Sequence, residues 1–144
     1  CTALQEVMFE EGATTIGFGS NFMGCTALTS ITFPSGVTYI PEKYLEGCTA
    51  LTSVTIPDSV INIGSDAFSN TGLESVVIPE NVQYLSTAFQ NCPSLTSMKF
   101  EGDAPVKFEE NFFSSLNPEL ILYYHRDTKG WTSPTFQGLL TEIW

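Results

Sequence analysis

The sequence predicts a leucine-rich solenoid: a β-rich, right-handed coil of about five to six turns, with one parallel sheet and an irregular C-terminal cap. Two observations carry this prediction. The stretch "CTALTSITFP" at Cys25 is nearly repeated 23 residues later, as "CTALTSVTIP" from Cys48. Leucines also recur at spacings of 22 to 24 residues, the length of one turn of a stacked coil, at Leu4, Leu28, Leu51, Leu73 and Leu95.

Each of these leucines opens a segment with the pattern of a β-strand. Apolar residues follow at the third and fifth positions, as in "LTSVTI" at 51–56, and this short alternating pattern favours a strand over a helix. The resulting L-x-x-L-x-L pattern is the strand signature of a leucine-rich repeat. Three strands are predicted to end at prolines, which lack a backbone donor: Pro34, Pro57 and Pro79.

The remainder of each coil has a part of fixed length and a part of variable length. A large aliphatic residue stands twelve positions after each of the first four leucines, at Ile16, Ile40, Ile63 and Leu85. A second bulky residue closes the coil four to six positions later, at Phe22, Leu45, Phe68 and Phe89. This combination suits a solenoid, because one side must stack in register while the other is free to bulge.

The chain is predicted to divide near residue 116. Residues 1–116 form the repeat array, with coils that start near residues 1, 25, 48, 70 and 92, and residues 117–144 form the last partial coil and the cap. The tail "HRDTKGWTSPTFQGLLTEIW" has no repeat register. Its apolar residues are expected to cover the last coil: Trp131, Phe136, Leu139 and Leu140.

The composition limits the classes of partner. Sixteen Asp and Glu residues oppose five Lys and Arg residues, which gives a net charge of -11. Such a surface repels nucleic acid and anionic lipid. No apolar run approaches the roughly 20 residues of a membrane span. We therefore expect neither nucleic-acid binding nor membrane insertion.

The segment "CTALTSVTIPDSVINIGSDAFSN" at 48–70 resembles the BspA-like class of leucine-rich repeats of bacterial surface proteins. The shared elements are the Cys-x-x-Leu opening, the Thr-Ile-Pro strand end and the Ser-Val, Ile-Gly and Ala-Phe pairs. The resemblance covers residues 1–116. It implies a cell-surface or secreted protein of bacteria or some protozoa, with a role in adhesion or host-protein binding.

The chain starts at Cys1, already in the register of the repeat, and is interpreted as a fragment of a longer protein. An uncovered first coil would expose the apolar residues Leu4, Val7 and Phe9. We expect that end to associate with other molecules, including a second copy of the chain.

The cysteines are predicted to form a ladder of buried, free thiols. Cys1, Cys25 and Cys48 fall at the same position of successive coils, and Cys92 follows, facing Asn70. Stacked side chains keep their Cβ atoms about 4.8 Å apart, beyond the usual range of roughly 3.5–4.5 Å for a disulfide. Zinc is disfavoured, because the sequence has one His and no C-x-x-C pair.

No catalytic, cofactor or metal site is predicted. His125 has no nucleophile motif such as G-x-S-x-G nearby. Each of the pairs Glu10–Glu11 and Glu109–Glu110 points to opposite sides of an extended chain, so neither converges on a substrate. The acidic stretch 101–110 lacks the D-x-D-x-D-G calcium loop and is interpreted as a solvated surface.

The best candidate site is the outer face of the predicted strands. Strand alternation turns the residues between the apolar columns outward. The candidate residues are Ser30, Thr32, Ser53, Thr55, Ser75, Val77, Ser97, Lys99, Ile121 and Tyr123. Solenoids commonly bind partners on such a surface. Ser and Thr are also simply good strand residues, and few of the Trp, Tyr and Arg anchors of tight interfaces are present.

Two functions remain open at this point. The first is a non-enzymatic interaction or adhesion module of a bacterial surface or secreted protein that binds a protein or a glycan on this face. The second is a passive structural spacer that displays another domain.

Overall fold

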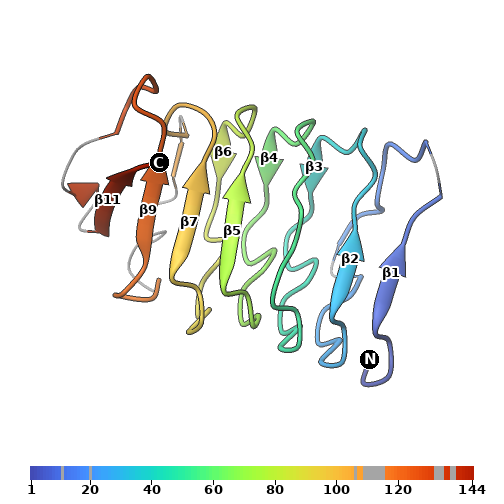
Figure 1. Ribbon diagram of the computed structural model, residues 1–144. Helices are drawn as coiled ribbons and strands as arrows, with labels where there is room; N and C mark the ends of the chain where they lie inside the picture. Colours follow the sequence, from blue (N-terminus) through green and yellow to red (C-terminus); the bar gives the residue numbers. More distant parts are fainter. Residues whose placement is uncertain (11, 20, 106, 109–115, 132–134, 137–138) are drawn as a thin grey trace.

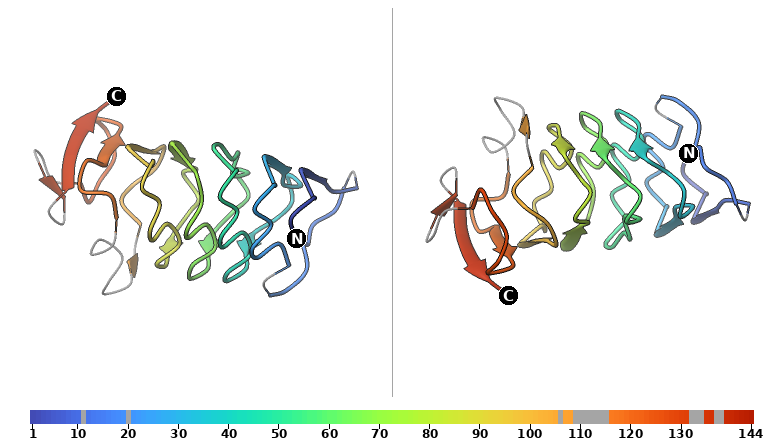
Figure 2. Two further views of the ribbon diagram at one scale, coloured as in Figure 1. Left: turned by 90° about the horizontal axis from the view of Figure 1, so that it is seen from below. Right: turned by 90° about the horizontal axis from the view of Figure 1, so that it is seen from above.

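The chain winds as a parallel β-solenoid of about five turns, which confirms the predicted fold (Figure 1). A computed structural model describes the chain except residues 11, 20, 106, 109–115, 132–134 and 137–138. The coils follow one another in a single row, with the two ends of the chain at opposite ends of the row (Figure 2).

One side of the coil carries parallel strands that follow the leucine columns. In register, Val7 pairs with Ile31, and Val76 pairs with Met98, which pairs with Leu122. The predicted apolar columns therefore lie side by side across coils. The strands are β1 (Glu6–Met8), β2 (Ser30–Thr32), β5 (Ser75–Ile78), β7 (Ser97–Phe100) and β9 (Ile121–Tyr124). We call their solvent side the strand face.

A second parallel sheet on the opposite side of the coil corrects the expectation of one sheet (Figure 2). Ile40 pairs with Ile63, which pairs with Leu85, so the twelve-residue column is a hydrogen-bonded ladder as well as a row of core side chains. The constant twelve-residue offset keeps these backbones in register. The backbone N–H and C=O groups of each coil can therefore pair with those of the next coil. The strands are β3 (Tyr39–Ile40), β4 (Asn62–Ile63), β6 (Tyr84–Leu85) and β8 (Lys107–Phe108).

The C-terminal segment is more regular than expected. Strand β11 (Leu139–Ile143) pairs in parallel with β9, and β10 (Thr135–Phe136) pairs antiparallel with β11. The segment thus extends the sheet of β5, β7 and β9. The division of the chain near residue 116 stays a prediction.

The covering residues of the cap divide into two groups. The Trp131 ring packs on Phe100, with ring centroids 4.6 Å apart, and Leu139 is buried. Leu140 is 56% exposed, so the expectation that it covers the core is wrong. Its neighbours Leu139 and Thr141 are the buried residues of β11, and alternation turns Leu140 outward. The side chain of Phe136 lies outside the described part of the chain.

The leucines fill the centre of the coil. Leu28, Leu51 and Leu73 are fully buried. The turn before the leucine recurs between coils, since the Leu28 N–H donates to the Cys25 carbonyl and the Leu51 N–H to the Cys48 carbonyl, both over 3.0 Å. Repetition of the same turn keeps the leucines in one column.

The residue just before this turn adopts a left-handed backbone in four successive coils. The φ angles are 70° at Gly24, 77° at Gly47, 57° at Asn70 and 53° at Asn91. Glycine and asparagine are the residues that tolerate this region best. The restriction of this position to Gly in two coils and Asn in the next two therefore follows from its backbone conformation.

Candidate binding face

The ten candidate residues do share one face of the molecule. Along it, Ser75 pairs with Ser97, which pairs with Ile121, and the Val77–Lys99–Tyr123 row runs beside them. Those in the first coils are exposed, and those from Ser97 onward are partly exposed. The predicted outward orientation is therefore present, while a binding role for these residues stays a prediction.

The third coil departs from the regular ladder. The segment at 51–56, predicted to be a strand, joins the second coil through the isolated bridge Thr32–Thr55 and forms no regular strand. By comparison, β5 and β7 pair along four residues. Val54 is only partly buried, whereas its equivalents Ile31 and Val76 are buried. The ladder of the strand face is thus interrupted at the third coil, which keeps one bridge to the second coil and, among the described residues, forms no ladder with β5 of the fourth.

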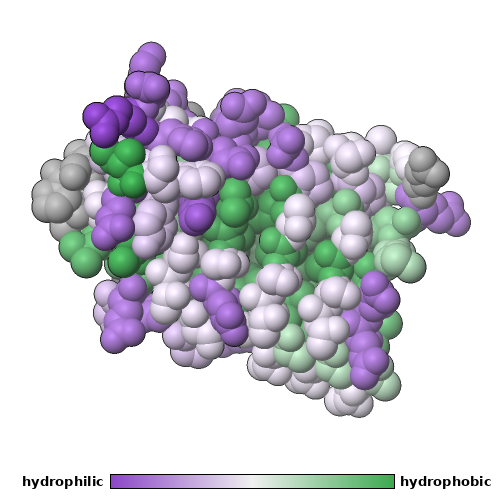
Figure 3. Space-filling model, in the orientation of Figure 1, coloured by the Kyte–Doolittle hydropathy of each residue, from purple (hydrophilic) through white to green (hydrophobic). Residues whose placement is uncertain are grey.

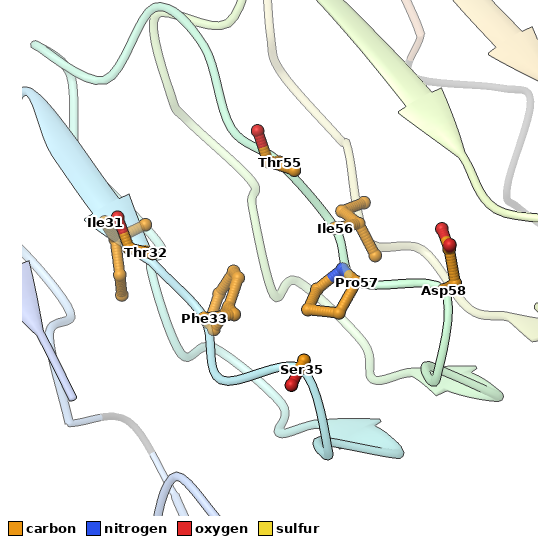
Figure 4. Close-up of a pocket in the computed structure, with 8 residues that line it drawn as sticks. All are labelled: Ile31, Thr32, Phe33, Ser35, Thr55, Ile56, Pro57 and Asp58. Atoms are coloured by element: carbon orange, nitrogen blue, oxygen red, sulfur yellow. The ribbon is translucent and has the colours of Figure 1, made fainter. Parts of the chain in front are cut away.

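A hollow of about 550 Å³ lies at this opening (Figure 4). Its two edges face each other: residues 31–35 of the second coil and residues 55–58 of the third. The buried side chains Ile31, Phe33 and Ile56 give it an apolar lining. Polar groups at exposed positions also line it: Thr32, Ser35, Thr55 and Asp58. In Figure 3, hydrophobic surface runs across the middle of this face.

Carboxylates follow the strand ends in the first, third, fourth and fifth coils and form what we call the acidic rim. It consists of the exposed residues Glu10, Asp58, Glu80 and Glu101. The Glu101 N–H donates to the Ile78 carbonyl over 3.0 Å, which holds adjacent coils together beside the rim. Within the described residues, no Lys or Arg forms an ion pair with these carboxylates. The rim is hence a row of exposed carboxylates, and hydrophilic surface gathers at this edge in Figure 3.

An aromatic cluster stands at the C-terminal end of the strand face. The Lys99 Nζ lies 4.7 Å from the Trp144 ring centroid and 6.0 Å from the Tyr123 ring centroid. The His125 ring stacks on Trp144 with centroids 4.5 Å apart. Sequence reasoning considered His125 only as a catalytic residue and did not place it or Trp144 on this face, because no repeat register covers them. The segment "LLTEIW" does not alternate between apolar and polar residues, so its pattern gave no strand signal there.

The buried cysteines have a structural role. Cys25, Cys48 and Cys92 are buried with free thiols, and Cys1 is exposed. The Cys48 thiol donates to the Phe22 carbonyl over 3.2 Å, in the turn of the preceding coil. Burial raises the pKa of the Cys48 thiol to about 11 and also raises the pKa of Cys92. These thiols are thus protonated donors, and they are poor nucleophiles.

The partner of Cys92 corrects the expected register. Its sulfur lies 3.3 Å from the Thr71 hydroxyl oxygen, so Thr71, rather than Asn70, occupies the cysteine column of the fourth coil. In the fourth coil the leucine follows this column position by two residues, at Thr71 and Leu73, instead of by three, as at Cys48 and Leu51. Gly72 permits this shorter connection. A Cβ on Gly72 would collide with the Thr49 carbonyl oxygen of the preceding coil.

Two findings on the described residues concern metal binding and membrane spans. No group of three or more His, Cys, Asp and Glu side chains among them is arranged to hold a metal ion. The same part of the chain contains no helix with the length and apolar character of a membrane span. Glu11, Glu109 and Glu110 of the carboxylate pairs lie outside the described residues.

A parallel β-solenoid whose coils carry L-x-x-L-x-L strands defines a leucine-rich repeat protein. The chain belongs to the BspA type leucine rich repeat family, whose model matches residues 1–119 in six copies. This confirms the resemblance found in the sequence. No curated protein matches the chain.

Three solved structures share the fold. A leucine-rich repeat protein from Bacteroides ovatus is 22% identical, with a TM-score of 0.57 over 86% of this chain and 34% of its own. A leucine rich cell surface protein from Faecalibacterium prausnitzii is 28% identical, with a TM-score of 0.53 over 69% of this chain and 34% of its own. The T. pallidum leucine rich repeat protein is 25% identical, with a TM-score of 0.52 over 82% of this chain and 61% of its own. The chain thus spans about a third of the first two proteins.

Proposed function

We propose that this chain is a non-enzymatic binding module of a bacterial cell-surface or secreted protein, and that it recognises a protein or a glycan through the strand face. Its family is one of bacterial cell-surface repeat proteins and implies an interaction module. Adhesion to a host or to another cell is the role we propose for it.

The observation that carries the proposal is the opening at Thr32 and Thr55. The second sheet forms a continuous ladder on the opposite side of the coil. On the strand face, the ladder instead opens over an apolar hollow. Concave, mostly apolar sites with a few polar groups are the usual form of ligand sites. The strand face is therefore the side on which we expect a partner.

The non-enzymatic part of the proposal rests on the family and on the chemistry of the thiols. Leucine-rich repeat proteins are typically non-enzymatic. The buried cysteines are occupied as hydrogen-bond donors, with pKa values raised by burial. Neither Cys48 nor Cys92 supplies a reactive thiolate.

The test compares the binding of two charge-matched double variants to arrays of host matrix proteins, cell-wall polymers and glycans. Ser53→Arg with Thr55→Arg places two long side chains on the strand face. Thr38→Arg with Gln83→Arg makes the same charge change beside the second sheet, at exposed positions.

We expect the first pair to abolish binding and the second pair to leave it unchanged. Equal binding by both variants would remove the strand face from the proposal. Binding by neither variant nor the parent chain would favour the spacer.

A further inference from the structure

We infer that the hollow between coils two and three binds an extended, positively charged peptide segment of a protein partner, with one large apolar side chain of that segment inserted in it. The inference rests on the proposed function, since it names the class of partner for the same face. Three features of the described residues carry it: the lining of the hollow, the charge beside it and the orientation of Lys99.

The apolar lining of the hollow favours a partner that inserts a large apolar side chain into it. The hollow is bounded by Ile31, Phe33 and Ile56, whose own side chains are at least 94% buried. Interface anchors are most often Trp, Tyr and Arg seated in desolvated pockets, and none of these residue types lines the hollow. An apolar side chain from the partner would remove the exposed part of this lining from water and gain the free energy of apolar burial.

The absence of an aromatic platform in the lining disfavours a sugar ring. The one aromatic residue there, Phe33, is 6% exposed, and its ring packs against Tyr44 and Phe68 at centroid distances of 6.2 and 6.5 Å. The Phe33 ring is thus occupied by packing inside the protein and does not offer a surface on which a sugar ring could stack.

The negative charge beside the hollow favours a partner segment that carries positively charged side chains. Asp58 lines the hollow, and Glu80 and Glu101 follow it in the next two coils. Coils stack about 4.8 Å apart, and alternate residues of an extended peptide are about 6.7 Å apart. A peptide that crosses the coils can therefore place Lys or Arg side chains over several of these carboxylates. Each of these Lys or Arg side chains would gain electrostatic attraction, because no ion pair within the described residues already neutralises the rim.

The positive charge on the strand face does not compensate the rim. Lys99 directs its ammonium group to Trp144, with Nζ 4.7 Å from the ring centroid. The net charge of -11 adds a long-range attraction for a basic segment.

The experiment selects a phage-displayed library of random 12-residue peptides on the folded chain at low salt and again at 500 mM NaCl. We expect the enriched peptides to combine two or more Lys or Arg residues with one large apolar residue. The best synthetic peptide is then titrated against three variants. Thr55→Arg blocks the hollow, Asp58→Asn with Glu80→Gln removes charge from the rim, and Glu42→Gln with Glu119→Gln removes the same charge at exposed positions elsewhere.

We expect Thr55→Arg to abolish binding, the rim variant to weaken it about 3- to 30-fold, and the control variant to change it less than 2-fold. Binding should also weaken at high salt, and less so for the rim variant.

Enriched peptides of neutral or acidic composition would overturn the inference, and so would equal binding by the rim and control variants. A glycan-array signal that Thr55→Arg abolishes, with no basic peptide enriched, would also overturn it while the proposed function stood. Enriched basic peptides that bind Thr55→Arg as well as the parent chain would overturn both.

Discussion

Thr32 and Thr55 form the isolated backbone bridge that joins the second coil to the third on the strand face. Other ladders of the strand face are longer: β1 and β2 pair along three residues, and β5 and β7 along four, whereas the described residues 51–56 form no ladder with β5. The second sheet continues across the same two coils without a break, since Tyr39 pairs with Asn62. The array is therefore opened on one side and held on the other, which leaves a hollow without breaking the solenoid.

The left-handed backbone at Gly47 and Asn70 predicts different changes in stability for substitutions in two neighbouring coils. Gly47→Ala places a Cβ at a φ of 77° and is expected to cost about 1–2 kcal/mol of unfolding free energy. Asn70→Gly removes a Cβ from the same strained region and is expected to be neutral or slightly stabilising. Urea denaturation followed by circular dichroism measures both. Equal stability of the two variants would contradict the strain.

The leucine column predicts a large cavity cost. Leu51 is fully buried, and Leu51→Ala is expected to lower the unfolding free energy by roughly 2–5 kcal/mol. Thr52→Ala, at the exposed neighbouring position, is the matched control and should change it by less than about 0.5 kcal/mol. The same urea titration compares them. A loss at Leu51 no larger than that of the control would argue against coils that share one core.

The thiols predict selective labelling. Of the four cysteines, we expect only the exposed Cys1 to react rapidly with a thiol reagent in the native state, and all four to react after denaturation. Cys1→Ser should remove the rapid phase. Rapid modification of a second thiol in native Cys1→Ser protein would show that the cysteine column is open to solvent.

The raised thiol pKa predicts alkaline destabilisation. The folded pKa of Cys48 is about 11, against an ordinary value of 9.0, so its protonated form is favoured in the folded chain. Because the unfolded thiol loses its proton first, stability should be fully present below about pH 9 and fall as the pH rises towards 11. Thermal melts between pH 8 and 11 measure this. Cys48→Ser, which keeps a donor, should show a smaller fall.

The contact of Lys99 with Trp144 predicts a measurable coupling. The ammonium lies 4.7 Å from the indole centroid, within the range of cation–π attraction. A double-mutant cycle of Lys99→Met and Trp144→Leu is expected to give a coupling of about 0.5–1 kcal/mol. Coupling near zero would mean that the two side chains do not interact in solution.

Self-association through the first coil stays a prediction. Leu4, Val7 and Phe9 are only partly buried there, unlike their equivalents in the second coil. Sedimentation of the 144-residue chain should therefore show concentration-dependent association, and Val7→Lys should weaken it. A strict monomer at high concentration would contradict this.

Much of the core could be predicted from the sequence alone. Leu28, Ile40 and Phe68 each occupy the predicted column, because apolar residues in a repeat have one place to go when every coil must shelter its neighbour. The strand alternation likewise placed Ser53 and Thr55 outward. Neither pattern reports hydrogen bonds between coils, so the second sheet at Ile63 and the weak pairing at 51–56 could not be predicted from them.

The repeat in the sequence determined the solenoid, its apolar columns and its family, because burial of periodic side chains depends on residue type and spacing alone. Only the tertiary structure decided where the ladder opens beside Thr55, how Trp144 reaches Lys99 and which residue faces Cys92. These features depend on how backbones of different coils approach one another. That approach is set by packing across the whole stack rather than by any single coil.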